Sequence, residues 1–185
     1  PRGVAQRERN SPMTAASDTS SRFRILCVCT GNICRSPTAE AVLRQKFSAA
    51  GLSDRVTVDS AGTHGYHIGA SPDPRSQAAG HARGYDFTGQ SARKLTPQDY
   101  DRFDLILAMD QEHMTIMTDA RPGNSRARLV MMRAFGATGT EQPQRPADVP
   151  DPYYGGSQGF EQVLDMIEEA ADGVVADVAS QLKNQ

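Results

Sequence analysis

The stretch FRILCVCTGNICRSP, residues 23–37, is the starting point for interpreting the whole chain. Residues 23–29 form a short apolar run of the kind that makes buried parallel strands. The run breaks at residues 30–32, and a helix is predicted to follow, with Ser36 as its N-cap and Pro37 in its first turn. A strand, a tight loop and a helix in this order open a βαβ unit.

The residues beyond this stretch continue the alternation of strands and helices. Apolar positions at helical spacing fill the first helix, and Gly51 is expected to end it. Further strands are predicted at residues 56–58, 104–109 and 128–132, with a turn at residues 59–62. Further helices are predicted at residues 73–82, after 96–99, at 111–118 and from 160 to 178. The pattern predicts one α/β domain over residues 22–185, with a four-stranded parallel sheet and helices on both faces, after a disordered tail at residues 1–21.

The composition of the 185 residues is that of a globular protein, with 38% hydrophobic residues, 23% charged residues and a formal net charge of −2. No apolar run reaches the roughly 18 residues that cross a bilayer. No basic stripe of the kind found in nucleic-acid binders is present, so we expect neither membrane nor nucleic acid as a partner. A mild basic cluster is interpreted as a solvated strand end: Arg126, Arg128 and Arg133.

The three cysteines, Cys27, Cys29 and Cys34, lie within eight positions of one another. A secreted domain held by disulfides spreads an even number of cysteines along its chain, and this sequence does not. The polar N-terminal stretch also lacks the apolar core of a secretory signal. Reduced thiols and a cytoplasmic location are therefore expected.

The loop that follows Cys29 has the composition of a phosphate-binding site, at the strand end where parallel sheets bind ligands. Five residues wound between a strand and a helix turn successive backbone N–H groups inward, where they form a nest for phosphate oxygens. Gly31 relieves crowding there, and Asn32 is the residue type best able to adopt a positive φ. Arg35 can grip two phosphate oxygens with its planar fork. The thiolate of Cys29, at the bottom of this positive bowl and near a helix N-terminus, is expected to be stabilised and poised for attack.

Hydrolysis of a phosphate ester also needs an acid that protonates the departing oxygen, and the loop contains none. Asp151, in the segment DPYY at residues 151–154, is the best candidate. Pro150 and Pro152 stiffen the segment that holds it. In the second half of the reaction the same carboxylate would deprotonate the water that attacks the phosphocysteine.

Taken together, these residues strongly resemble the low-molecular-weight protein tyrosine phosphatase family. The likeness rests on VCTGNICRSP at residues 28–37 and DPYY at residues 151–154, and it covers residues 22–182. Four shorter segments lie between them in the family's order: DSAGT at 59–63, PDPR at 72–75, AR at 92–93 and AMD at 108–110. The resemblance implies a four-stranded parallel sheet between helices, a flavodoxin-like or Rossmann-like arrangement. It also implies phosphotyrosine-containing proteins as substrates, inorganic phosphate as product, and neither a metal nor an organic cofactor. We expect a monomer.

The resemblance assigns roles to individual residues. Cys29 is the nucleophile, Arg35 the phosphate clamp and Asp151 the general acid and base. Asn32 and Ser60 would lock the shape of the loop. A further group would bind substrate by lining the bowl or its aromatic wall, and its Ser36 would donate a hydrogen bond to the sulfur of the nucleophile. The members of this group are Thr30, Gly31, Asn32, Ile33, Cys34, Ser36, Tyr66, Tyr153 and Tyr154.

Several positions keep more than one interpretation. Cys34 is either a core residue or the partner of Cys29 in a reversible, protective disulfide, whereas Cys27 is expected to pack in the core. Asp110 either orients the phosphate loop or caps the next helix. Tyr66 stands where many family members carry tryptophan, so an aromatic wall is kept. One pair of histidines has metal-ligand spacing but no third ligand nearby, and it is expected to be solvated: His64 and His67.

Three rival functions are weighed against these residues. An arsenate reductase of the same fold needs further cysteines downstream, and the sequence has none after Cys34. A protein-arginine phosphatase tends to carry threonine where Ile33 stands. A non-catalytic phosphotyrosine-binding module would be expected to lose Cys29 or Asp151, and both are present. The role of Gln90, which stands where some animal members have a histidine, stays open.

Overall fold

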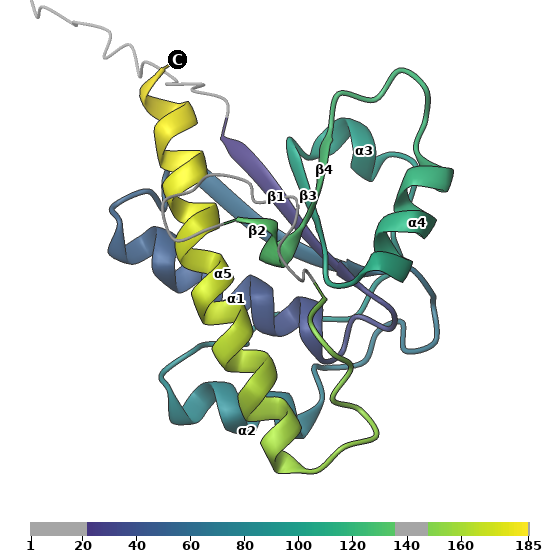
Figure 1. Cartoon of the computed structure of the whole chain (residues 1–185), viewed down its shortest axis with the longest axis vertical. Coiled ribbons are helices and arrows are strands. Elements are labelled where there is room, and N and C mark those ends of the chain that lie inside the picture. The colour runs from purple at the N-terminus through teal and green to yellow at the C-terminus, as the bar shows by residue number, and fades with distance from the viewer. Residues whose placement is uncertain (1–21, 136–147, 185) are drawn as a thin grey trace, which may run out of the picture.

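The computed structural model of the chain describes residues 22–135 and 148–184 (Figure 1). The expected tail at residues 1–21 lies outside these described residues, as do residues 136–147. The described strands form one parallel sheet in the order β2-β1-β3-β4. Their bounds are β1 (Phe23–Cys29), β2 (Val56–Gly62), β3 (Leu105–Ala108) and β4 (Arg128–Met131). The predicted four-stranded parallel sheet is confirmed.

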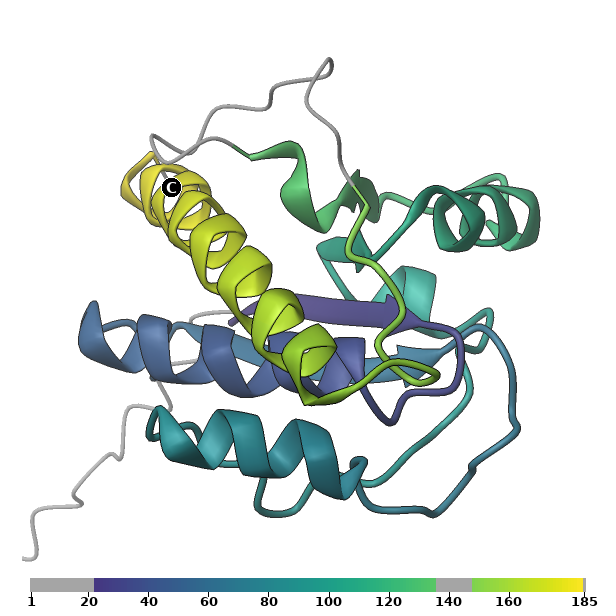
Figure 2. The same ribbon diagram turned by 60° about the horizontal axis from the view of Figure 1, so that its bottom comes forward.

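Helices cover both faces of this sheet (Figure 2). One face packs against α1 (Arg35–Ala49) and α5 (Ser157–Lys183), and α2 (Pro74–Ala82) packs on these two helices. The other face packs against α3 (Asp99–Arg102) and α4 (Gln111–Ala120), and a 3-10 turn, η1 (Met132–Ala134), follows β4. Side chains of β1 alternate between these two cores, with Ile25 and Cys27 on the α1 side and Leu26 and Val28 on the α3 side. Burial on both faces explains why the strands are continuous apolar runs. No helix in the described ranges combines the length and the apolar character needed to span a membrane.

The turn predicted at residues 59–62 is wrong, because these residues continue β2. Asp59 pairs with Leu26 and Ser60 with Cys27 in the parallel register with β1. The polar residue types favour a turn in the sequence. The structure nevertheless accommodates Ser60 in a buried strand because its hydroxyl accepts a hydrogen bond from the side chain of Asn32. Pairing with a neighbouring strand has overridden local preference.

The predicted N-cap is also wrong, because the first helix begins at Arg35 and Cys34 occupies the cap position without a side-chain hydrogen bond. The hydroxyl of Ser36 is turned toward the sulfur of Cys29 instead. At the other end of the helix Gly51 adopts the expected positive φ of 71°. The predicted helix at residues 73–82 is confirmed as α2, with Asp73 as its N-cap.

The sheet order places the loop after β1 where the chain switches direction across the sheet. From β1 the chain moves to β2 on one side, and it later returns to β3 on the other side. The carboxyl ends of β1, β2 and β3 lie at one edge of the sheet, so residues far apart in the sequence meet around the loop that follows Cys29. Open parallel sheets bind their ligands at such a switch point.

Candidate active site

The loop between β1 and α1 is fastened by the residues that follow β2. The carbonyl of Cys29 accepts a hydrogen bond from the amide of Thr63 at 2.8 Å, and the carbonyl of Thr30 accepts one from the amide of His64 at 3.0 Å. Gly62 permits this close approach, because a Cβ atom there would lie 2.7 Å from the carbonyl oxygen of Thr30. The carbonyl groups at the start of the loop are therefore hydrogen-bonded to the residues that follow β2.

The backbone amides of the same loop, by contrast, have no hydrogen-bond acceptor among the described residues. In the described part of the chain, no protein group accepts a hydrogen bond from the backbone amides of residues 30–34. The loop borders a cavity of about 300 Å³, to which it contributes Cys29, Thr30, Gly31, Ile33, Cys34 and Arg35. Backbone amides are rarely left without an acceptor, and a run of them beside a helix N-terminus favours a bound anion.

Asn32 shapes this loop from within. It is the non-glycine residue with a positive φ among those described, at 56°, as predicted for it. Its buried side-chain amide donates to the hydroxyls of Ser36 and Ser60, both at 2.9 Å, and its side-chain oxygen accepts from the amide of Arg93 at 2.9 Å. These three hydrogen bonds hold a backbone conformation that few residues adopt readily.

A buried glutamate that was not predicted from the sequence, Glu40, holds the side chain of Ser60. Glu40 on α1 accepts a hydrogen bond from the Ser60 hydroxyl at 2.5 Å. Burial raises the pKa of Glu40 to about 6, although the Ser60 hydrogen bond and the charge of Arg44 act in the opposite direction. The available signal was an acidic residue within the apolar face of the first helix, where a charged residue needs a partner.

The three thiols of the chain lie in different environments, and all are free. The sulfur of Cys29 lies in the cavity and 3.0 Å from the hydroxyl of Ser36. Cys27 faces the core, where burial raises the pKa of its thiol well above the ordinary value. Burial, followed by the charge of Asp73, raises the pKa of Cys34 to about 12. Cys27 and Cys34 therefore stay protonated at neutral pH, and no disulfide joins Cys29 to Cys34 in this structure.

The guanidinium of Arg35 is buried and held from several sides. Its Nη1 donates to the carboxylate of Asp110 at 2.7 Å and to the carbonyl of Val149 at 3.1 Å. Its Nη2 lies 3.3 Å from the hydroxyl of Thr30 and 3.4 Å from the carboxylate of Asp151. Its Nε has no acceptor among the described residues. The Nη1 contacts fix the plane of the guanidinium and leave its Nε and Nη2 edge for a ligand.

Asp110 performs both of the tasks that the sequence left open. Its Oδ1 accepts from the amide of His113 at 2.9 Å and so caps α4, while its Oδ2 holds Arg35. The ring of His113, also missed by the sequence analysis, places Nε2 2.8 Å from the Thr30 hydroxyl and Nδ1 3.0 Å from Asp110. Burial, and then the charge of Arg35, lower the pKa of His113 to about 4, so the imidazole is neutral at pH 7. In the sequence, the available signal for His113 was its position in the first turn of a helix that follows Asp110 at the end of a strand.

Asp151 and the predicted aromatic residues form the mouth of the cavity. The Asp151 side chain is 47% exposed, and its Oδ1 accepts from the amide of Tyr153 at 3.0 Å. The segment is anchored by Val149, which is fully buried and donates from its amide to the carbonyl of Met109 at 2.7 Å. The aromatic wall consists of Tyr66, His67, Tyr153 and Tyr154.

The remaining residues considered in the sequence lie around this mouth. Tyr66 is 69% exposed and stacks on His64 with ring centroids 5.0 Å apart. Gln90 donates to the carbonyl of Pro37 at 3.1 Å, so it supports the start of α1 and makes no hydrogen bond to Ser36.

Comparison with known proteins gives the same picture as the geometry. Residues 24–184 match the family described as low molecular weight phosphotyrosine protein phosphatase. The low molecular weight protein-tyrosine-phosphatase of Streptomyces coelicolor is 40% identical over 168 residues, which cover 88% of this chain and 98% of that protein. A solved protein tyrosine phosphatase from Entamoeba histolytica matches with a TM-score of 0.79 and 35% identity, over 86% of this chain and 99% of that one. YfkJ from Bacillus subtilis matches with a TM-score of 0.75 and 34% identity, over 90% and 99% of the two chains. On these similarities the chain belongs to the low molecular weight phosphotyrosine protein phosphatase family.

Proposed function

We propose that this chain hydrolyses phosphotyrosine in proteins, with Cys29 as nucleophile, Arg35 as phosphate clamp and Asp151 as general acid and base. The observation that carries this proposal is the row of unpaired amides at residues 30–34 around a buried thiol. A neutral ligand would leave most of these donors unsatisfied, whereas a phosphate dianion supplies an acceptor for each. The thiol then lies beneath the phosphorus atom.

The phosphoryl group is held before the reaction by the amides and by one edge of Arg35. The contact between Arg35 Nη2 and Asp151 is 3.4 Å, longer than an ordinary hydrogen bond. A phosphate dianion can therefore replace the Asp151 carboxylate at Nη2 and take the hydrogen of Nε as well. Asp110 and Val149 keep the guanidinium in place during this exchange.

In the first half of the reaction the Cys29 thiolate attacks phosphorus in line with the bond that breaks. A sulfur–phosphorus bond forms, the phosphorus–oxygen bond of the ester breaks, and Asp151 gives its proton to the tyrosine oxygen. The hydroxyl of Ser36, 3.0 Å from the sulfur, donates to the thiolate before attack and again as it is regenerated. In the second half a water molecule loses a proton to Asp151 and attacks phosphorus. The sulfur–phosphorus bond then breaks and inorganic phosphate is released.

The shape of the cavity favours an aromatic phosphate ester. A phosphotyrosine ring can pack against Tyr66, Tyr153 and Ile33, which line the cavity. Phosphoserine is shorter and brings no ring, so it loses roughly 1.5–3 kcal/mol of apolar burial. This loss corresponds to about a tenfold to hundredfold disadvantage, to which the poorer alkoxide leaving group adds.

The substrate class is tested by comparing kcat/KM for phosphotyrosine, phosphoserine and phosphoarginine peptides of one sequence. We expect strong preference for phosphotyrosine, with phosphoserine nearly inert and phosphoarginine poor. Ile33→Thr should shift the balance toward phosphoarginine, because it removes apolar surface beside the phosphate and adds a hydroxyl. A wild-type enzyme that prefers phosphoarginine would contradict the proposed substrate.

A further inference from the structure

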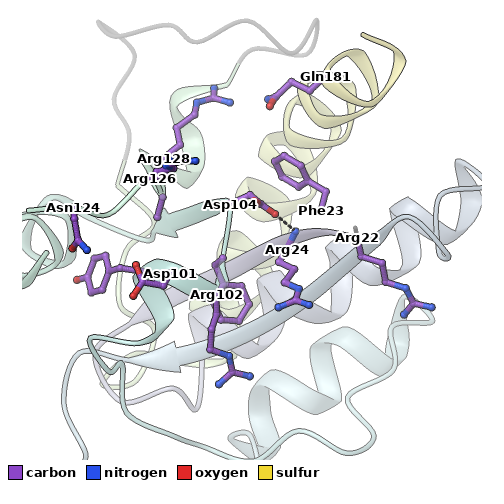
Figure 3. Close-up of a pocket in the computed structure, with 13 residues that line it drawn as sticks. Arg22, Phe23, Arg24, Asp101, Arg102, Asp104, Asn124, Arg126, Arg128 and Gln181 are labelled. Carbon is purple, nitrogen blue, oxygen red and sulfur yellow. Dashed lines mark hydrogen bonds between the residues drawn. The ribbon is translucent and has the colours of Figure 1, made fainter. Parts of the chain in front are cut away.

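A second cavity, of about 680 Å³, lies at the opposite end of the sheet from Cys29 (Figure 3). It is more than twice the volume of the active-site cavity. Its walls come from residues 22–24 at the start of β1, residues 100–104 between α3 and β3, and residues 126–128 at the start of β4. These are the amino ends of three neighbouring parallel strands, whereas the phosphate loop lies at their carboxyl ends.

Arginine dominates the charge around this cavity. Two aspartates, Asp101 and Asp104, also line it, so the formal charge of the lining is 5 − 2 = +3. Figure 3 shows that the arginines come from different segments of the chain. They are Arg22, Arg24, Arg102, Arg126 and Arg128. Arg126 and Arg128 belong to the basic cluster expected at a solvated strand end, and the fold adds three arginines to them.

Most of these guanidinium groups have no partner among the residues that the structure describes. Arg128 is paired with Asp177 at 2.9 Å. The side chains of Arg22, Arg24, Arg102 and Arg126 make no hydrogen bond or ion pair within residues 22–135 and 148–184. Asp104, which also lines the cavity, accepts from the backbone amide of Arg24 at 2.7 Å and not from its guanidinium. Four arginines around one cavity, none of them paired with another described residue, outweigh the two aspartates of the lining and form a positive field.

The floor of the cavity is apolar and fixed. Phe23, Tyr100 and Phe103 line it and are buried against the core. The hydroxyl of Tyr100 donates to the carbonyl of Met117 at 2.8 Å, so it is already used. A low-dielectric floor beneath exposed guanidinium groups strengthens their attraction for an anion.

We propose that this groove, the arginine groove lined by residues 22–24, 100–104 and 126–128, binds a small polyanion that carries two or more linked phosphate groups. The arginines come from separate segments of the chain (Figure 3), and a chain of linked phosphates can bridge guanidinium groups that a single phosphate would contact only in part. The planar guanidinium matches phosphate oxygens in pairs.

The probe for this site is inorganic tripolyphosphate, added to the full chain with the active site saturated by inorganic phosphate. Amide NMR shifts should then appear at Arg24 and Asp104 and not at Gly31. Replacing Arg24 and Arg126 together by glutamine should weaken binding about tenfold or more, because charged hydrogen bonds are lost. Lys94→Gln is the matched control: it removes a positive charge at the other end of β2, where Lys94 pairs with Gly62, and should leave the affinity unchanged.

Three outcomes would overturn the arginine groove as a polyphosphate site. Binding that disappears when inorganic phosphate saturates the active site would place the ligand there. Sulfate that binds as well as tripolyphosphate at equal ionic strength would indicate general screening. Equal weakening by Lys94→Gln and by the arginine variants would indicate net charge alone. Since these arginines are exposed and far from Cys29, kcat/KM and the melting temperature should stay at wild-type values in all variants.

A second inference, which rests on the proposed function, concerns the contacts of His113 with Thr30 and Asp110. Arg35 Nη2 donates to the Thr30 hydroxyl, so the hydrogen of that hydroxyl remains for His113 Nε2. The imidazole then carries its hydrogen on Nδ1, which lies 3.0 Å from Asp110 Oδ1 without reaching hydrogen-bond geometry. Asp110 Oδ2 in turn accepts from Arg35.

We infer that His113 is a positioning residue that holds Thr30 and Asp110, and through them Arg35, in the geometry that grips the phosphoryl group. His113 does not line the cavity, and its hydrogen bond to Thr30, which does, is its connection to the site. Without its ring, the Thr30 hydroxyl loses its acceptor and Asp110 loses its contact with Nδ1, while Arg35 and the amide of His113 still contact Asp110. Arg35 is then free to rotate away from the phosphate position, and small misplacements of this kind are costly.

The test is a double-mutant cycle on kcat/KM with an aryl phosphate. His113→Ala and Thr30→Val should each lower kcat/KM about tenfold to hundredfold, and the double variant should lose little more than either single variant. His113→Gln, which can still accept from Thr30, should recover part of the loss. Met117→Ala on the same helix is the control, because Met117 is fully buried in the core: it should lower the melting temperature and leave kcat/KM unchanged.

Additive losses in the double variant would contradict the positioning role of His113. A loss in Met117→Ala equal to that in His113→Ala would reduce the effect to stability alone. If the wild-type chain shows no turnover at all, the proposed function has failed, and the cycle cannot then be read as a failure of the His113 inference.

Discussion

Replacing Cys29 by serine is expected to abolish turnover, with a loss on the order of 10⁶-fold, the scale seen when a covalent nucleophile is removed. A serine hydroxyl is not ionised at neutral pH and is a far weaker nucleophile than a thiolate. The amides of residues 30–34 and the guanidinium of Arg35 are untouched by the substitution, so inorganic phosphate should bind nearly as well as in the wild type. Single-turnover kinetics and calorimetric titration with phosphate measure the two effects separately.

Cys34→Ser is the matched control for this experiment. Cys34 lines the same cavity, but burial raises the pKa of its thiol to about 12, so it supplies no thiolate at neutral pH. Its loss should therefore reduce turnover far less than the loss of Cys29. Rapid-quench mass spectrometry of the wild type should find the phosphoryl group on Cys29. A phosphoenzyme that maps to Cys34 or Cys27 would assign the nucleophile elsewhere.

The fold could be predicted from the sequence because its strands are buried on both faces. Runs such as residues 23–29 and 105–108 have few polar residues, and the segments between them show helical spacing. The prediction failed where a buried polar group is satisfied by a distant partner. Ser60 was expected in a turn, yet it lies in β2, because Asn32 and Glu40 supply its hydrogen bonds. Residue type alone cannot show such a partner.

The residues of the candidate site likewise divide into those that could be predicted from the sequence and those that could not. The phosphate loop is contiguous, so Cys29, Asn32 and Arg35 could be picked out from their spacing alone. His113 lies 83 residues from Thr30, and the carbonyl of Val149 lies 114 residues from Arg35. These contacts exist because the carboxyl ends of β1 and β3 are neighbours in the sheet. Only the strand order brings these distant residues together, and that order was not predicted from the sequence.

Replacing Asp151 by asparagine is expected to lower kcat/KM for phosphotyrosine roughly 10²–10⁴-fold, the usual contribution of a general acid. Asparagine keeps the size of the side chain and an oxygen that can accept from the amide of Tyr153, as the carboxylate does at 3.0 Å. The buried Val149 anchors the segment in both proteins. What the variant lacks is a transferable proton at the mouth of the cavity.

The dependence of this loss on the leaving group distinguishes proton transfer from a structural effect. An aryl phosphate with an activated leaving group needs less protonation, so Asp151→Asn should reduce its cleavage much less than that of phosphotyrosine. Asp148→Asn serves as the control, because Asp148 is in the same segment and its carboxylate accepts from the amide of Gln111 at 3.0 Å. It should change neither rate appreciably. Kinetics on both substrates decide the matter, since equal losses on the two in Asp151→Asn would mean that Asp151 shapes the loop and transfers no proton.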